Sequence, residues 1–163
     1  MCPVAGFWMG GGDFWRGRMI AHCLVIETER DGLVLVDSGF GTRDIEGKTA
    51  LSFAFRRFVG PTLDPREPAV AQIVALGYKP EDLRHVVVTH LDVDHAGGIS
   101  DFPHAKVHVH AREHAAAMAR ATFRERERYV SNVIAHLLDW DFAAENLRLA
   151  SPDAARERGP GSG

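Results

Sequence analysis

The chain has 163 residues, of which 45% are hydrophobic and 25% are charged, and this balance is typical of one globular domain. Its formal net charge of −3 gives no electrostatic basis for binding nucleic acid or an anionic membrane, and no stretch approaches the ~20 apolar residues of a membrane span. Two cysteines are too few for a disulfide framework, so we expect reduced thiols in a cytoplasmic protein.

The first regular elements are predicted from two apolar runs, residues 19–28 and 33–37. A turn containing Asp31 and Gly32 separates them, which is typical of a β-hairpin. Because both runs are nearly continuous in apolar residues, we expect their strands to be covered on both faces.

A helix is predicted to begin at Asp64, where Asp64 and Glu67 have the spacing of a capping box, and to end at Gly77. Residues 43–63 before it predict a packed loop or a short helix. The apolar run 85–89 follows as a short buried strand, and helix, loop and strand in this order indicate α/β layering.

The pattern continues with a strand at 105–110 and a helix from Ala111 to about Tyr129. A second helix is expected at about 131–138. The composition of residues 156–163 is typical of a disordered tail.

Six of the nine histidines fall between His85 and His110, and two of these lie in one loop directly after the apolar strand. That loop carries His90, Asp92, Asp94 and His95. A cation between the two aspartates would relieve their repulsion, and imidazole and carboxylate ligands suit zinc, iron or manganese. The alternative is a polar loop with Asp94 as the N-cap of a following helix, which leaves the histidine spacing unexplained. Other histidines, His108 among them, read as surface residues without a partner.

The loop resembles the His-x-His-x-Asp-His signature of the metallo-β-lactamase superfamily, with Asp92 in place of the usual second histidine. The resemblance implies that His90 and Asp92 bind one metal ion and that Asp94 and His95 bind a second. Zinc is the first expectation for the divalent metal. Because a carboxylate is a harder ligand than imidazole, Asp92 shifts the preference toward iron or manganese.

The predicted hairpin resembles the opening hairpin of the lactonase-like branch of that superfamily. The resemblance implies that Asp37, which ends the second run, lies near the metal loop and orients a ligand. The alternative for Asp37 is a turn residue before Ser38 and Gly39. We expect His22 either to point toward the pocket, where it would support the metal ligands as Asp37 does, or to be a buried histidine of the hairpin whose hydrogen bonds are satisfied.

The superfamily fold is an αββα sandwich built from two halves, and this chain resembles the N-terminal half. We expect an α/β half-sandwich in residues 1–140, with one mixed β-sheet flanked by helices. Residues 141–163 match nothing in the family and are expected to be disordered. A face made of six apolar side chains would then have no partner layer; they are Leu24, Ile26, Leu33, Leu35, Val86 and Val88.

No histidine after His95 has the setting of the C-terminal ligands of the family. The chain is therefore interpreted as a truncated or frameshifted product, as a fragment whose C-terminal half is a separate chain, or as a compact derivative that works as a homo-oligomer.

The resemblance implies a metal-dependent hydrolase of small esters, lactones or related acyl substrates that uses a metal-activated hydroxide. Asp94 would be both a ligand and the catalytic proton acceptor. The alternative is a non-catalytic metal-binding remnant or a subunit of a split hydrolase. A third interpretation is an α/β interaction module that binds no metal.

Overall fold

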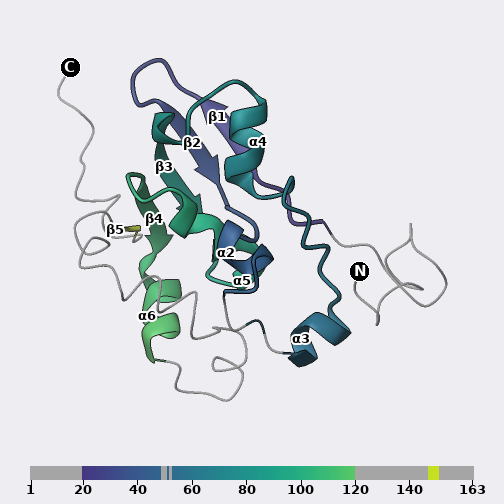
Figure 1. Cartoon of the computed structure of the whole chain (residues 1–163). Coiled ribbons are helices and arrows are strands. Elements are labelled where there is room, and N and C mark those ends of the chain that lie inside the picture. Colours follow the sequence, from purple (N-terminus) through teal and green to yellow (C-terminus); the bar gives the residue numbers. More distant parts are fainter. Residues whose placement is uncertain (1–19, 49–50, 52, 120–146, 151–163) are drawn as a thin grey trace.

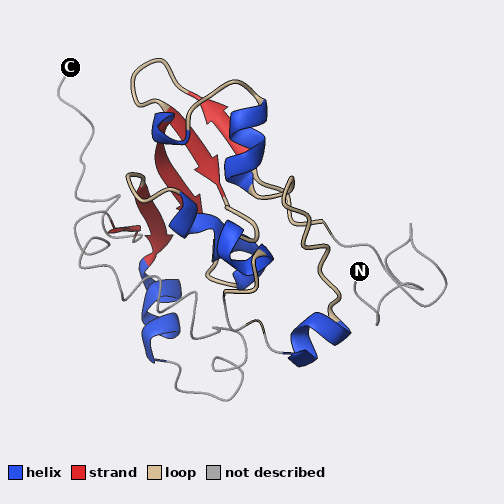
Figure 2. Cartoon of the chain, in the orientation of Figure 1, coloured by secondary structure: helices blue, strands red, loops and turns tan. Residues whose placement is uncertain are grey.

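The computed structural model describes residues 20–48, 51, 53–119 and 147–150, so the expectations for the segments at 120–146 and 151–163 lie outside the described residues. The described chain forms a five-stranded sheet in the order β1-β2-β3-β4-β5 (Figures 1 and 2). Its strands are β1 (Leu24–Glu27), β2 (Leu33–Val36), β3 (Leu83–Val88), β4 (Lys106–His110) and β5 (Leu147–Ala150). Strands β1 and β2 are antiparallel and the other pairs are parallel, which confirms the mixed sheet.

The hairpin prediction is also confirmed, and its turn depends on Gly32. This residue has φ 73°, a left-handed conformation that favours glycine. A Cβ at Gly32 would lie 2.8 Å from Arg84 Cγ and 2.9 Å from the carbonyl oxygen of Asp82. The turn therefore requires glycine both for its backbone and for its close contact with the start of β3.

Short helices connect the strands and cover one face of the sheet (Figure 2). The α-helices are α2 (Thr42–Ile45), α3 (Phe53–Phe58), α4 (Ala69–Ala75), α5 (Val93–Ala96) and α6 (Ala111–Ala119), and the 3-10 turns are η1 (Pro80–Asp82) and η2 (Gly97–Asp101). Helices α2 and α3 lie in the region where a packed loop or short helix is expected. None of the described helices combines the length and the apolar character needed to cross a membrane.

The predicted start of the α4 helix is wrong by four residues, because its N-cap is Pro68 and not Asp64. Asp64 Oδ1 accepts a hydrogen bond from the Arg66 amide (2.9 Å), so the capping residues form a separate turn. The helix begins only after Pro68, because a proline disfavours helical geometry in the residue before it. The predicted end is confirmed: the amides of Gly77 and Tyr78 donate to the last helical carbonyls in a Schellman arrangement.

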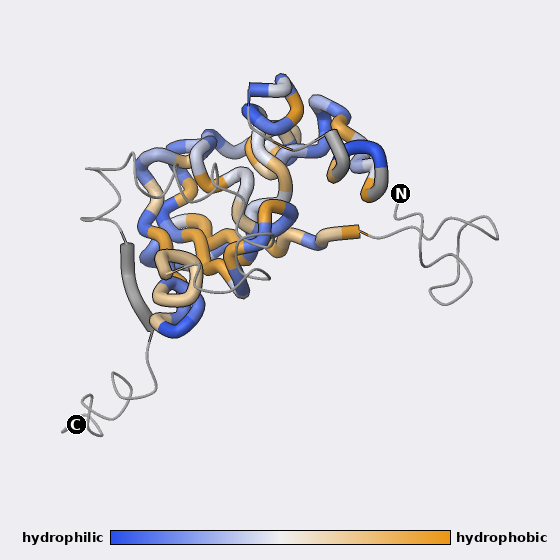
Figure 3. Tube along the Cα trace, turned by 90° about the horizontal axis from the view of Figure 1, so that it is seen from below, coloured by the Kyte–Doolittle hydropathy of each residue, from blue (hydrophilic) through white to orange (hydrophobic). Residues whose placement is uncertain are grey.

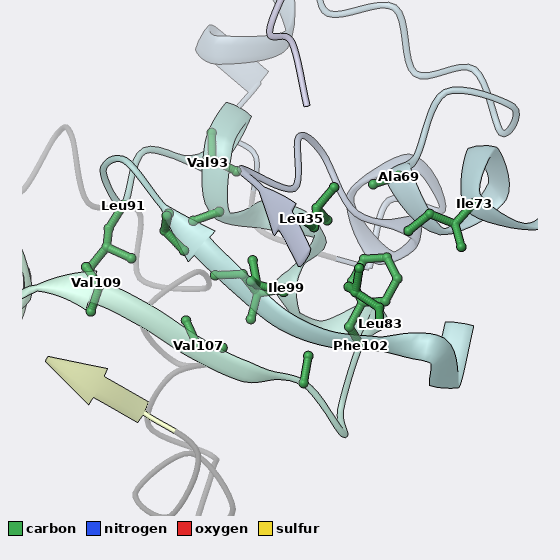
Figure 4. Close-up of a cluster of buried hydrophobic side chains, with 14 of the residues drawn as sticks. Leu35, Ala69, Ile73, Leu83, Leu91, Val93, Ile99, Phe102, Val107 and Val109 are labelled. Atoms are coloured by element: carbon green, nitrogen blue, oxygen red, sulfur yellow. The ribbon is translucent and has the colours of Figure 1, made fainter. Parts of the chain in front are cut away.

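The core lies between the sheet and the helices that cover it. Figure 4 shows Leu35 of β2 and Val107 and Val109 of β4 in one cluster with side chains of α4 and η2. The largest fully buried apolar side chains are Leu35, Ile73, Leu83, Val86, Leu91, Val107 and Val109. Along the chain trace, the hydrophobic stretches gather in the interior (Figure 3). This core holds the carboxyl end of β3 in place.

The opposite face of the sheet carries exposed apolar side chains. Leu24, Ile26 and Val87 are 58%, 42% and 37% exposed. The expectation that both hairpin strands are covered on both faces is therefore wrong for β1. The expected single apolar face is also divided: Leu33, Leu35, Val86 and Val88 are buried under the helices, whereas Leu24 and Ile26 pair with Val36 and Val34 on the other side.

Strand β5 has no counterpart among the predicted strands. It pairs in parallel with β4, from Val107↔Leu147 to His110↔Ala150. Its four residues fall within 141–163, where the sequence pattern is weak. A four-residue strand is too short to give a reliable alternation signal, and its partner strand is distant in sequence.

Candidate metal centre

The loop with the four candidate ligands follows directly after β3. His90 and Leu91 lead to Asp92, which is the N-cap residue of the short helix α5. The amides of His95 and Ala96 both donate to the Asp92 carbonyl oxygen at 2.9 Å. Asp94 lies inside the first turn of α5 and is not its N-cap, and Asp92 makes no side-chain capping bond. The interpretation of Asp94 as the N-cap of this helix is therefore wrong, and Asp92 occupies the N-cap position without a capping side-chain bond.

The four side chains come together as two histidine–aspartate pairs. His90 Nε2 lies 3.3 Å from Asp92 Oδ2, and His95 Nε2 lies 3.6 Å from Asp94 Oδ2. The centroids of the two imidazole rings are 4.0 Å apart. All four side chains are partly exposed, between 23% and 31%, so ions and water can reach them.

Asp37 lies beneath this cluster and orients His95. Its side chain is 8% exposed, and Oδ2 is 2.9 Å from His95 Nδ1. A carboxylate accepts hydrogen bonds, so Nδ1 of the neutral ring carries the proton and Nε2 keeps its lone pair. Asp37 also has φ 55°, a conformation that is uncommon outside glycine and is concentrated at functional sites.

The segment after Asp37 fastens the two loops together. The Ser38 amide and hydroxyl both donate to the His95 carbonyl oxygen, at 2.7 and 3.0 Å. The Gly98 amide donates to the Gly39 carbonyl oxygen at 2.9 Å. A Cβ at Gly98 would lie 2.5 Å from the Ser38 carbonyl oxygen, so the close approach of these two backbone segments requires glycine at position 98.

Gly98→Ala is therefore expected to destabilise the protein by about 1–3 kcal/mol, since backbone must move to admit the methyl group. Denaturant unfolding measures this, and faster hydrogen exchange of the Ser38 amide would locate the damage in the loop. Gly77→Ala is the matched control: it has φ 91° but open space around a Cβ. It should cost stability through backbone strain and leave Ser38 protected; equal exchange of Ser38 in both variants would contradict the packing argument.

Two supporting residues are missing from the sequence-based site. The Thr89 hydroxyl lies 2.8 Å from Asp37 Oδ2 and 2.9 Å from His90 Nδ1. Glu113, on α6, accepts a hydrogen bond from the Leu91 amide at 3.0 Å and so anchors the middle of the loop. Position 89 directly precedes the motif, which could have drawn attention to Thr89. No local signal marks Glu113.

The sequence-predicted supporting residue His22 lies before β1, and its side chain is exposed. No hydrogen bond from His22 to the loop occurs within the described part of the chain. Its neighbour Cys23 is closer to the site, because Cys23 Sγ lies 3.4 Å from the position of a Cβ on Gly39. Burial of this sulfur, and then the charge of Asp37, raise the pKa of Cys23 to about 11.

Cys23 is therefore expected to be a slow nucleophile although the residue is exposed overall. In a Cys2→Ser background, the alkylation rate of the metal-free protein should rise with pH and reach half its maximum near pH 11, against about 8.5 for an ordinary thiol. Asp37→Asn removes the smaller, electrostatic cause and should lower that midpoint in part. A wild-type midpoint near that of free cysteine would contradict this assignment.

Away from the loop, His108 does have a partner, contrary to the sequence expectation. His85 Nδ1 and His108 Nε2 are 2.9 Å apart on neighbouring strands of the sheet. An open depression of about 630 Å³ lies beside His85, at the hairpin-turn end of β3. Its lining includes Arg84 and Lys106 but none of the four candidate ligands.

The chemistry of the donor set fits a divalent metal ion. Each pair offers one imidazole nitrogen and one carboxylate oxygen, and Asp37 accepts the hydrogen bond that metal-binding histidines usually donate through their other nitrogen. Among the described residues, however, no group of three or more His, Cys, Asp or Glu side chains is placed to hold one ion. The described part therefore supplies two ligands for each presumed ion.

Comparison with known proteins decides the family. The family model of the metallo-β-lactamase superfamily matches residues 16–153. The chain belongs to this superfamily. It is 46% identical over 120 residues to a "probable metallo-hydrolase" of Mycobacterium tuberculosis (strain ATCC 25618 / H37Rv), a match that covers 72% of this chain and 37% of the relative.

The lactonase-like resemblance is supported as well. An N-acyl homoserine lactonase of Bacillus cereus is 28% identical over 121 residues, covering 74% of this chain and 48% of the lactonase. A solved structure of an N-acyl homoserine lactone hydrolase, with the product N-hexanoyl-L-homoserine bound at its catalytic metal centre, has a TM-score of 0.56 at 28% identity; the match covers 79% of this chain and 46% of that one. The chain thus spans less than half the length of these superfamily relatives.

Proposed function

We propose that this superfamily chain carries a metal-dependent hydrolase site for small lactones, esters or related acyl compounds. The observation that supports it most is the pairing of His90 with Asp92 and of His95 with Asp94, with the imidazole rings 4.0 Å apart. The lactonase relatives favour a cyclic ester as the substrate. The free thiol of Cys23 agrees with a cytoplasmic location.

The proposed site gives each residue a separate role in metal binding or proton transfer. His90 and Asp92 would hold one ion, and Asp94 and His95 the other. When bound, divalent ions supply Lewis acidity toward a carbonyl and an acidified water at neutral pH. Asp94 would also accept a proton as the ester opens, and Asp37 keeps the lone pair of His95 Nε2 directed into the site.

Asp92 should tune the choice of metal. Because a carboxylate is harder than imidazole, zinc is the first candidate but iron or manganese compete better here than at an all-histidine site. Asp92→His, which restores the usual signature, is expected to raise the ratio of zinc to manganese bound from an equimolar mixture. Elemental analysis measures this ratio, and an unchanged ratio would remove Asp92 from the ligand set.

The alternative function is a non-catalytic metal-binding remnant or one subunit of a split hydrolase. It is favoured by the donor set, because no group of three or more ligands for one ion occurs among the described residues. In this interpretation residues 1–140 form a half-domain completed by a second copy or another chain. The family match to residue 153 and strand β5 both continue past that boundary.

The experiment that separates the two functions compares the zinc-loaded chain with Asp94→Asn, which keeps the shape but weakens the acceptor. Opening of N-hexanoyl-L-homoserine lactone is followed by the acid that it releases. The proposal expects zinc-dependent hydrolysis in the wild type and in the exposed control His104→Ala, and its loss in Asp94→Asn. Bound zinc without any difference in rate between wild type and Asp94→Asn would instead favour the non-catalytic function.

A further inference from the structure

One carboxylate reaches both imidazoles of the candidate centre by two different routes. Asp37 Oδ2 contacts His95 Nδ1 directly at 2.9 Å. Toward His90 the route passes through Thr89, whose hydroxyl oxygen is 2.8 Å from Asp37 Oδ2 and 2.9 Å from His90 Nδ1. The Thr89 amide donates separately to Asp37 Oδ1 at 2.8 Å, so this backbone position is fixed without the hydroxyl.

The number of protons decides the direction of the second route. A threonine hydroxyl has one hydrogen and two lone pairs, whereas a carboxylate can only accept. The Thr89 hydrogen is therefore directed to Asp37, and a lone pair of Oγ1 faces His90 Nδ1. That nitrogen must carry the hydrogen of the neutral ring, which leaves the lone pair on Nε2, the atom that lies 3.3 Å from Asp92 Oδ2.

We propose that Thr89 is a positioning residue that fixes the tautomer and ring orientation of His90 for metal binding. Asp37 then sets the same tautomer in both histidines, once directly and once through Thr89. This inference rests on the proposed metal site for its purpose, but the hydrogen-bond chain itself exists without a metal. It also explains why a hydroxyl residue precedes the first ligand, where any β-branched residue could end the strand.

The variants that test the proposal separate the hydroxyl of Thr89 from its methyl group. Thr89→Val keeps the shape and the backbone amide bond to Asp37 but offers His90 no acceptor. Thr89→Ser keeps the hydroxyl and loses only a methyl group. If Thr89→Val does not fold, Thr89→Ala makes the same test, because it also lacks the hydroxyl.

The first measurement is the ¹⁵N chemical shifts of the imidazoles in the metal-free protein at about pH 8, above the ordinary histidine pKa of about 6.5. Wild type and Thr89→Ser should show His90 protonated at Nδ1, whereas Thr89→Val should move the proton to Nε2. His95 is the internal control, since its bond to Asp37 does not involve Thr89. An Nδ1-protonated His90 in Thr89→Val, or its loss in Thr89→Ser, would overturn the proposal.

The second measurement is zinc affinity by competition with a chromophoric chelator. Thr89→Val should bind zinc about 10–100-fold more weakly, the usual effect of losing such a supporting hydrogen bond, and Thr89→Ser should restore most of the affinity. Equal affinity in wild type and Thr89→Val would count against a positioning role. If the wild type binds no zinc, the proposed function fails, yet the tautomer measurement still decides the hydrogen-bond chain.

Discussion

His90→Ala and His95→Ala are each expected to weaken zinc binding by roughly 100-fold. Apparent zinc binding free energies of about 10–16 kcal/mol, divided over four ligands, place about 3 kcal/mol on each ligand. In this chain the loss is severe because each histidine is one of only two described donors in its pair. Metal content after dialysis and a chelator competition both measure the effect.

His104→Ala is the matched control for these variants. His104 is exposed and lies outside the loop, so the same change of side chain should leave zinc binding as it is in the wild type. Equal zinc content in His90→Ala, His95→Ala and His104→Ala would show that the loop is not the metal site. A loss in His95→Ala alone would point to a single ion at the Asp94 pair.

The site could be predicted from the sequence where its chemistry is local. Asp92, Asp94 and the two histidines lie within six consecutive residues after a strand, so backbone geometry alone brings them close together. The hydrogen bonds of Asp37 with Thr89 and His95 are different, because these residues are 52 and 58 positions away from Asp37 along the chain. They were accessible only through the resemblance to a known hairpin, and the structure places Asp37 beneath the loop.

Contacts between distant segments without a motif could not be predicted. Glu113 reaches the Leu91 amide across 22 residues, and Ser38 reaches the His95 carbonyl across 57. Each depends on how the strands are ordered in the sheet, and a lone glutamate or serine carries no signal of that order. The Thr89 relay needs the same information, since the hydroxyl acquires its direction only from Asp37.

The fold shows the same limit. Apolar runs located the strands β1, β2 and β3, and an alternating pattern located β4. The central strands β2 and β3 need apolar side chains whatever surrounds them. The runs did not show which face each side chain would occupy. The antiparallel register of β1 places Leu24 and Ile26 on the face away from the described helices, and hydropathy alone does not specify that register.

The second large effect that we expect is a slow rate of hydrolysis, and it follows from the small number of described ligands. The 163-residue chain, loaded with zinc, is expected to open a lactone or an activated ester far more slowly than roughly 1 per second, the lower end of ordinary enzyme rates. Catalytic zinc sites use three protein ligands and leave one position for water. Two ligands, the number that each presumed ion finds among the described residues, would leave the ion weakly held and its water insufficiently acidified.

The assay that checks this rate uses a chain purified as a monomer, because Leu24, Ile26 and Val87 form an exposed apolar surface that favours self-association. Rates are measured with zinc, iron or manganese, and with Asp94→Asn as the background. The expected result is a small metal-dependent rate for the wild-type monomer. A separate dimer fraction would show a larger rate if the second copy completes the ligand set. A monomer that turns over a lactone at about 1 per second or faster would contradict this expectation. Either the two described ligands per ion would then suffice, or residues outside the described ranges would supply the rest.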